Sequence, residues 1–246
     1  MEALLAEGIE DVRDIPAGRL ANATHERIRR VTVSGRPELD PQAGKALRGL
    51  AYPRYYLDFE TIAFPVPIWK STRPYQPIPF QWSCHIERRD GALDHTEFLD
   101  LSGDDPTRAF AENLIKTLGD RGPIFVYNQG FEGRVLEDLA QRHRKLAPGL
   151  QAIKSRLVDL LPIARESYYH PAMRGSWSIK AVLPTIAPEL DYAELEDVQD
   201  GGQAQEAYLE AVAPETERSR KAEIMAALRR YCGRDTEAMI RLARLL

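Results

Sequence analysis

The feature that most limits how this chain can fold is a strand-rich stretch in its first half. Three runs, residues 55–60, 79–88 and 93–101, mix aromatic and β-branched residues in the way that is typical of strands. The pair Asp90 and Gly91 separates the second run from the third, and this dipeptide favours a tight hairpin turn. We therefore expect three consecutive antiparallel strands.

Helix and strand patterns alternate after these strands. Residues 105–120 have apolar side chains at helical spacing, with Asp104 or Asp105 available as the cap. The next segments are an apolar strand, a helix, and a short run that is either a last strand or the start of a helix: residues 123–128, 131–143 and 156–161. This order predicts an α/β protein (α+β, with a mixed sheet) of the ribonuclease H-like type, with five strands flanked by helices, although many α+β domains share it.

The first fifty residues differ in composition from the rest. Residues 1–50 are rich in Arg and Ala and show only weak periodicity. We expect them to form a helical extension or linker, which in a longer protein would join residues 51–246 to an additional nuclease domain that this sequence lacks. Residues 51–246 are expected to form one domain.

Composition argues against several classes of protein. No segment reaches the roughly 18 consecutive apolar residues that span a bilayer, and the acidic first residues do not resemble a signal peptide. We therefore expect a cytoplasmic protein with no membrane partner. Cys84 and Cys232 lack the spacing of zinc or iron–sulfur ligands, so any metal is expected to have oxygen ligands.

The charge balance argues against a protein that binds nucleic acid mainly through a broad basic surface. The formal net charge is −4 and the isoelectric point is about 5.8. These values do not exclude a nuclease, because an acidic metal centre itself lowers the formal charge. Basic residues are concentrated in residues 19–36 and 134–156, and each stretch is equally compatible with a solvated helix face.

A pair of carboxylates in the first strand is the first candidate for chemistry. Asp58 and Glu60 are two residues apart, so the pleat directs both side chains to one face, while Leu57 and Phe59 point to the other. Two carboxylates on one face are suited to metal ligation. A lone pair of this kind is more often the polar face of an edge strand, so only its combination with further motifs favours function.

The second candidate follows the apolar strand at residues 123–128. Asn128, Phe131 and Glu132 lead from that strand into the next helix, and Glu132 falls in the first turn. A carboxylate in a first turn often does no more than complement the helix dipole. Taken alone, this position therefore favours a structural role.

The third candidate lies in a late helical segment. Tyr231 and Asp235 are four residues apart, so the phenol and the carboxylate share one helix face and can project into one site. Taken singly, Tyr231 is equally compatible with a core aromatic and Asp235 with a surface charge. Lys180, in the segment GSWSIK, is a secondary candidate that either contacts phosphate or lies in solvent.

Together these elements resemble, in order and spacing, the three motifs of the DEDD (DnaQ-like) 3′–5′ exonuclease superfamily. One departure is that Glu132 stands where the superfamily usually has Asp. The segments PYQPIPFQWSCH, YYHPAMRGSWSIKAVLP and YCGRDTEAM also resemble a bacterial family known only as a conserved domain of unknown function. The matching residues are Asp58 and Glu60 for D-x-E, Asn128, Phe131 and Glu132 for N-x-x-F-D, and Tyr231 and Asp235 for the Y-x-x-x-D of the DEDDy type.

The resemblance implies a metal-dependent exonuclease that hydrolyses phosphodiester bonds at the 3′ end of DNA or RNA, using two divalent cations, Mg²⁺ or Mn²⁺. It also implies that the four carboxylates hold these metals and that Tyr231 orients the attacking water. The residues expected at the substrate are Thr61, Asn128 and Phe131, with Lys180 as a further contact.

Two other functions stay open. The chain is also compatible with a catalytically weak or inactive nucleic-acid-binding or structural module of a larger nuclease, because Glu132 is one methylene longer than the usual Asp. An endonuclease or resolvase of the same broad fold would use clustered carboxylates as well. The spacing of Tyr231 and Asp235 favours the exonuclease.

Overall fold

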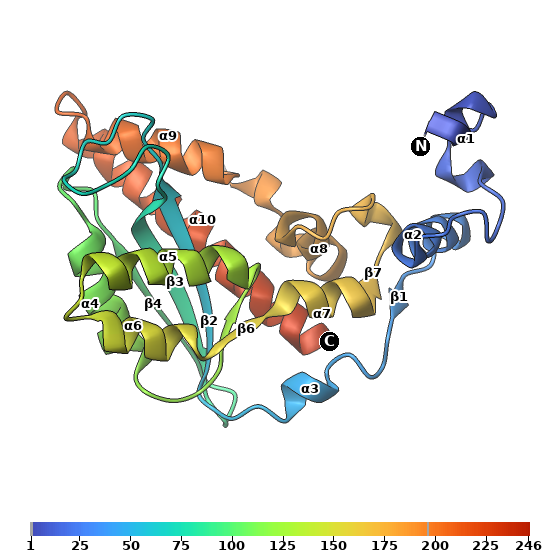
Figure 1. Cartoon of the computed structure of the whole chain (residues 1–246), viewed down its shortest axis with the longest axis horizontal. Coiled ribbons are helices and arrows are strands. Elements are labelled where there is room, and N and C mark those ends of the chain that lie inside the picture. Colours follow the sequence, from blue (N-terminus) through green and yellow to red (C-terminus); the bar gives the residue numbers. More distant parts are fainter. Residues whose placement is uncertain (1, 196) are drawn as a thin grey trace.

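The computed structural model describes residues 2–195 and 197–246, and its centre is a five-stranded mixed sheet (Figure 1). The strands of this sheet are β2 (Arg54–Ile62), β3 (Ile78–Glu87), β4 (Leu93–Leu99), β5 (Ile124–Val126) and β6 (Leu157–Asp159). Their spatial order is β4-β3-β2-β5-β6. β2, β3 and β4 pair antiparallel, whereas β5 runs parallel to both β2 and β6.

This sheet confirms the α/β architecture that the sequence predicts, and it is consistent with a ribonuclease H-like fold. The three predicted strands form its antiparallel half, and Asp90 and Gly91 lie in the turn between β3 and β4. Residues 156–161 are expected to form either a last strand or the start of a helix, and the structure has both. Asp159 ends β6, and its side chain caps the next helix, α7 (Leu160–Ser167), by accepting a hydrogen bond from the Leu161 N–H.

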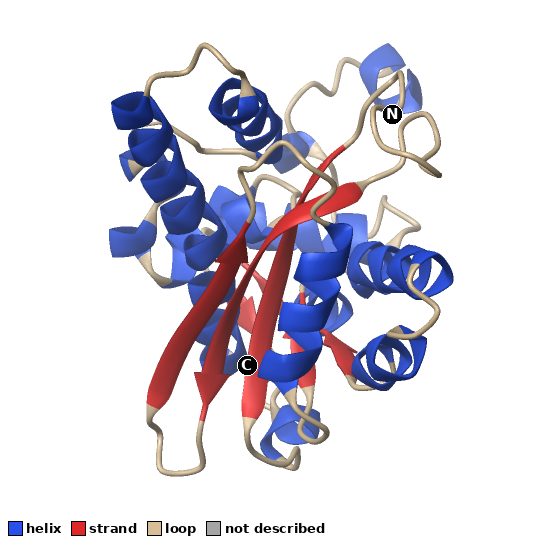
Figure 2. Cartoon of the chain, turned by 90° about the vertical axis from the view of Figure 1, so that its left-hand side faces the viewer, coloured by secondary structure: helices blue, strands red, loops and turns tan. Residues whose placement is uncertain are grey.

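Helices cover both faces of the sheet (Figure 2). The helices on one face are α4 (Thr107–Leu118), α5 (Gln129–Arg142) and α6 (Ala147–Lys154). The main helices on the other face are α7, α8 (Ile179–Ile186), α9 (Gly201–Val212) and α10 (Arg218–Leu245). Short 3₁₀ turns connect several of these helices: Pro171–Met173, Pro188–Leu190 and Tyr192–Glu194.

The alternation of side chains along β2 decides which residues reach which layer. Leu57 and Phe59 are buried in the core that α4, α5 and α6 form with the sheet. Tyr56 lies in the other core, which includes residues of α10. Because side chains alternate along a strand, Asp58 and Glu60 project to the same side as Tyr56, toward the α10 layer.

The first fifty residues contain helices, as predicted, but they also supply a strand. Their elements are α1 (Glu2–Ala6), the 3₁₀ turn Val12–Asp14, α2 (Ala23–Ser34), β1 (Glu38–Leu39) and α3 (Lys45–Arg48). β1 pairs antiparallel with β7 (Tyr168–Tyr169) in a separate two-stranded sheet. The domain division at residue 50 stays a prediction.

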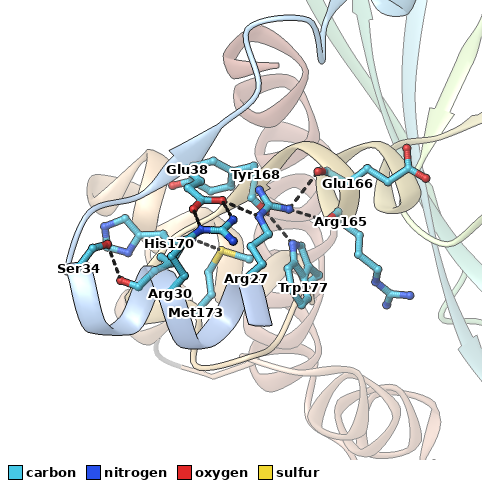
Figure 3. Close-up of polar contacts among 11 residues, drawn as sticks. Arg27, Arg30, Ser34, Glu38, Arg165, Glu166, Tyr168, His170, Met173 and Trp177 are labelled. Atoms are coloured by element: carbon cyan, nitrogen blue, oxygen red, sulfur yellow. Dashed lines mark hydrogen bonds and ion pairs between the residues drawn. The ribbon is translucent and has the colours of Figure 1, made fainter. Parts of the chain in front are cut away.

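Polar contacts fasten this extension to the rest of the chain (Figure 3). The guanidinium group of Arg27 donates hydrogen bonds to the carbonyls of Arg165 and Glu166, at 2.9 and 3.0 Å. Arg27 and Arg30 both form ion pairs with Glu38. Within the basic stretch at residues 19–36, Arg27 therefore docks α2 against the segment before β7, and Arg30 pairs with Glu38 inside the extension.

Among the described residues, no helix combines the length and the apolar character that crossing a membrane requires.

Candidate active site

A pocket of about 200 Å³ brings together most of the residues that the motifs single out. Its lining comes from residues 58–60 within β2, from the residues that follow β5, and from α5, α8 and α10. Its lining includes all four carboxylates and the tyrosine of the motifs: Asp58, Glu60, Glu132, Asp235 and Tyr231. Three of the four residues expected at the substrate also line it: Asn128, Phe131 and Lys180.

Thr61 is the exception among the predicted site residues. It follows Glu60 directly, and the register of β2 against β3 shifts between the two residues, so that Thr61 lies opposite Pro79. Thr61 is partly exposed and does not belong to the lining of the pocket. Its contact with a substrate stays a prediction.

The centre of the pocket is the pair of carboxylates on β2, beside a thiol from α10. Ligand atoms of Asp58, Glu60 and Cys232 all lie within 4.8 Å of one another. The Cys232 sulfur is 3.7 Å from Oδ2 of Asp58. Burial, followed by the charges of the neighbouring carboxylates, raises the pKa of this thiol well above its ordinary value, so Cys232 is a neutral neighbour rather than a thiolate ligand.

Asp235 is held by a tyrosine that the sequence did not single out. The hydroxyl of Tyr192 donates a hydrogen bond to Oδ1 of Asp235. Lys180 completes this side of the pocket: its Nζ lies 4.9 Å from the centre of the Tyr231 ring and donates a 2.8 Å hydrogen bond to the carbonyl of Gln199. Lys180 is therefore fixed at the pocket rather than free in solvent.

Glu132 enters the pocket from the first turn of α5. Only 2% of its surface is exposed, and its Oε2 has no hydrogen-bond partner among the described residues. A buried carboxylate oxygen without a partner is costly unless a ligand satisfies it. The longer side chain in place of the usual Asp thus reaches the same pocket as the other three carboxylates.

The turn before α5 is held by Asp159. Its two carboxylate oxygens accept hydrogen bonds from the backbone N–H groups of Asn128 and Gln129, each at 3.0 Å. Asn128 has φ +88°, in the left-handed region that Asn adopts more readily than most residues. Asp159 therefore fixes the turn that carries Asn128 and Glu132 to the pocket.

Burial and mutual repulsion raise the pKa values of the carboxylates. Burial, with the charge of Asp235, raises the pKa of Glu60 to about 8, and burial raises that of Glu132 to about 8. Burial raises the pKa of Asp235 to about 6, although the hydrogen bond from Tyr192 opposes this rise. The pKa of Asp58 is raised well above its usual value by burial and by its three neighbouring carboxylates. The pocket therefore holds protons at neutral pH unless positive charge enters it.

Asp159→Ala is expected to destabilise the protein by about 1–2 kcal/mol, because it removes the acceptor of three backbone N–H groups. Urea unfolding measures this change. Asp159→Asn retains one oxygen acceptor, so its free energy of unfolding is expected to lie between those of the unaltered protein and Asp159→Ala. Equal stability of all three would show that the carboxylate does not hold the turn.

Comparison with known proteins identifies a family. The sequence profile of one family matches residues 55–178, about half of the chain. The chain belongs to the family described as Domain of unknown function (DUF2779). Searches of the curated proteins and of the solved structures gave no significant match.

The family match covers only part of the pocket. The matched segment contains Asp58, Glu60 and Glu132 and ends before Tyr231 and Asp235. The DUF2779 description gives no activity, so the chemistry of the pocket has to be inferred from its geometry.

Proposed function

We propose that this protein is a metal-dependent 3′–5′ exonuclease that hydrolyses phosphodiester bonds of DNA or RNA. The observation that supports this most strongly is the convergence of four carboxylates, from β2, α5 and α10, on one pocket beside Tyr231. Structural ion pairs do not account for this cluster, because four like charges share the pocket with a single lysine, Lys180. Such a cluster has to bind either protons or cations, and bound cations would allow all four carboxylates to ionise.

The residues fit Mg²⁺ or Mn²⁺. Both ions prefer carboxylate oxygens and water as ligands. The free Oε2 of Glu132 supplies a donor without a competing partner. Asp58, Glu60, Glu132 and Asp235 would hold two such ions. When bound, the pair of cations would supply an activated water for in-line attack and stabilise the leaving 3′ oxygen.

The other side chains of the pocket position the reactants. Burial raises the pKa of Tyr231 above its ordinary value, so its phenol stays protonated and can orient a water molecule by hydrogen bonding. Tyr192 donates a hydrogen bond to Oδ1 of Asp235 and so holds this carboxylate in place at the pocket. Lys180 offers a positive charge to a phosphate, and Phe131 offers an apolar surface to the terminal nucleotide.

The test is an incubation of the chain with 5′-labelled single-stranded DNA and RNA oligonucleotides in Mn²⁺, in Mg²⁺ and in EDTA. We expect a ladder of products that shorten from the 3′ end in either metal and no products in EDTA. The relative rates on the two substrates give the preferred sugar. Internal cuts without a ladder would favour an endonuclease of the same fold, and intact label under every condition would contradict the proposal.

A further inference from the structure

The loop between β2 and β3, residues 63–77, exposes side chains that neither the fold nor the pocket uses. Tyr75 is 71% exposed, and Val66 and Ile68 are also exposed. Lys70 is exposed as well. The loop begins directly after β2, the strand whose residues Asp58 and Glu60 line the acidic pocket.

The loop is firmly attached to the rest of the protein. The indole of Trp69 donates a hydrogen bond to the carbonyl of Gly103, and Arg142 of α5 donates to the carbonyls of Lys70 and Ser71. Gln76 donates a hydrogen bond to the carboxylate of Asp138 on α5. Exposed side chains on this loop are therefore held in place by several contacts to α5 and to the segment before α4.

Tyr75 is held in a conformation that a tyrosine does not favour. Its φ is +57°, and its N–H donates a 2.8 Å hydrogen bond to the carbonyl of Phe64. A large side chain in the left-handed region costs backbone energy. The exposed ring recovers little of this cost by burial, so the fold alone does not explain why an aromatic residue stands there.

One face of α5 connects the pocket to this loop. Phe131, Arg134 and Asp138 are three and four residues apart and so share a face of the helix. Phe131 lines the acidic pocket, and Asp138 lines a hollow between α5 and the loop. At 1.5 Å per residue these two positions are about 10 Å apart along the helix axis, the rise of about three stacked nucleotides.

The path that leads from the pocket along this face of α5 to the loop carries charges that suit a phosphate backbone. Arg134 is exposed between the pocket and the loop. The lining of the hollow contains three cations, Lys70, Arg73 and Arg142, and two carboxylates, Asp105 and Asp138. The ion pair of Arg73 with Asp138 is 3.3 Å long and the arginine is largely exposed, so the pair is weak and Arg73 is free to bind another anion.

We propose that this path binds single-stranded nucleic acid on the 5′ side of the nucleotide in the pocket. Bases stack on Tyr75, while Arg134, Lys70 and Arg73 contact phosphates. Aromatic stacking and cationic side chains are the two means by which proteins hold single strands without reading sequence. The inference rests on the proposed nuclease function and specifies its substrate as a polymer of several nucleotides.

The test is fluorescence anisotropy of 5′-fluorescein oligonucleotides of two and twelve nucleotides, as DNA and as RNA, with the whole chain in EDTA so that no hydrolysis occurs. Tyr75→Asn, which removes the ring but tolerates positive φ, is expected to weaken binding of the twelve-mer about tenfold. Tyr75→Phe is expected to bind like the unaltered protein. Arg134→Ala is expected to lower the slope of log affinity against log salt by about 0.7.

Matched controls separate a local effect from a general change of charge. Lys116→Ala and Arg121→Ala remove exposed cations from α4 and from the segment before β5, away from the path. Both variants are expected to leave the twelve-mer affinity unchanged. The dinucleotide, which occupies the pocket alone, is expected to show no difference between Tyr75→Asn and the unaltered protein.

The outcomes distinguish this inference from the proposed function. Loss of twelve-mer affinity in Tyr75→Asn and Arg134→Ala supports the path even if the protein cleaves nothing. Twelve-mer affinity that is the same in Tyr75→Asn, Arg134→Ala and both controls would overturn the path, and the exonuclease would stand if the ladder is seen. Equal weakening by the controls would also overturn it, because binding would then follow net charge.

Discussion

Asp58→Asn is expected to abolish metal-dependent cleavage, by about 10³-fold or more, and at the same time to stabilise the metal-free protein. Activity falls because Asp58 lines the pocket together with the three other carboxylates and would be one of the residues that hold the cations. Stability rises because the amide keeps the shape of the side chain and is neutral at every pH, whereas Asp58 stays neutral in the metal-free pocket only by binding a proton that the unfolded chain releases. Cleavage rate and thermal unfolding in EDTA measure the two effects.

The opposite signs are what make this variant informative. A carboxylate that only stabilises the fold would lower both quantities when it is replaced, and that result would contradict a catalytic role for Asp58. The control is Asp120→Asn, which changes an exposed carboxylate outside the lining of the pocket. It is expected to leave both activity and stability unaltered.

Divalent cations are expected to stabilise the protein more at pH 7.5 than at pH 5. Glu60 and Glu132 have pKa values of about 8 in the folded protein, against an ordinary value of 4.5. Between these values the unfolded chain loses protons that the folded chain retains, so the stability of the metal-free protein falls as the pH rises. Cations reverse this loss by replacing the protons. At pH 5 protons compete with the cations for the same oxygens.

The size of the effect follows from mass action. At a free Mn²⁺ concentration 100 times the dissociation constant, stability rises by about 2.7 kcal/mol, or about 5–10 °C for a chain of this length. Thermal unfolding with Mn²⁺ and with EDTA at both pH values isolates the contribution of the pocket from that of other titrating groups. A shift of equal size at both pH values, or one that persists in Asp58→Asn, would place cation binding elsewhere.

The central sheet could be predicted because local rules determine it. Strand composition and the Asp90-Gly91 turn give β3 and β4, and alternation along β2 places Asp58 and Glu60 on one face. Helical spacing likewise brings Tyr231 and Asp235 to the same side of α10. In each case the periodicity of one element is sufficient to relate the residues.

The parts that could not be predicted depend on contacts between distant segments. Tyr192 binds Asp235 across 43 residues from a short 3₁₀ turn, and no pattern in the sequence indicates this pairing. Cys232 adjoins Tyr231 in the sequence, but only the packing of α10 against β2 brings its sulfur to Asp58. Nothing in the pattern of residues 156–161 indicates that Asp159 holds the turn before α5.

Helix capping and the roles of surface charges also depend on contacts that the sequence patterns do not show. Asp105 does bind the N–H of Thr107 at the start of α4, as expected, but the residue at the cap position is Pro106. Much of the basic stretch at residues 134–156 serves structure, since Arg142 and Lys154 form ion pairs and Arg156 binds backbone carbonyls. Only the folded structure shows that Arg134 stays exposed near the pocket.

The most direct test of the acidic pocket as a metal centre is a calorimetric titration of the metal-free chain with Mn²⁺ at pH 7.5, alongside Asp58→Asn. We predict that two ions bind to the unaltered protein and that the carboxylates with raised pKa values release protons as the ions bind. Asp58→Asn is expected to bind at least one ion fewer. Absence of Mn²⁺ binding at millimolar concentrations, or equal binding by the two proteins, would contradict the assignment of this pocket as a metal-dependent active site.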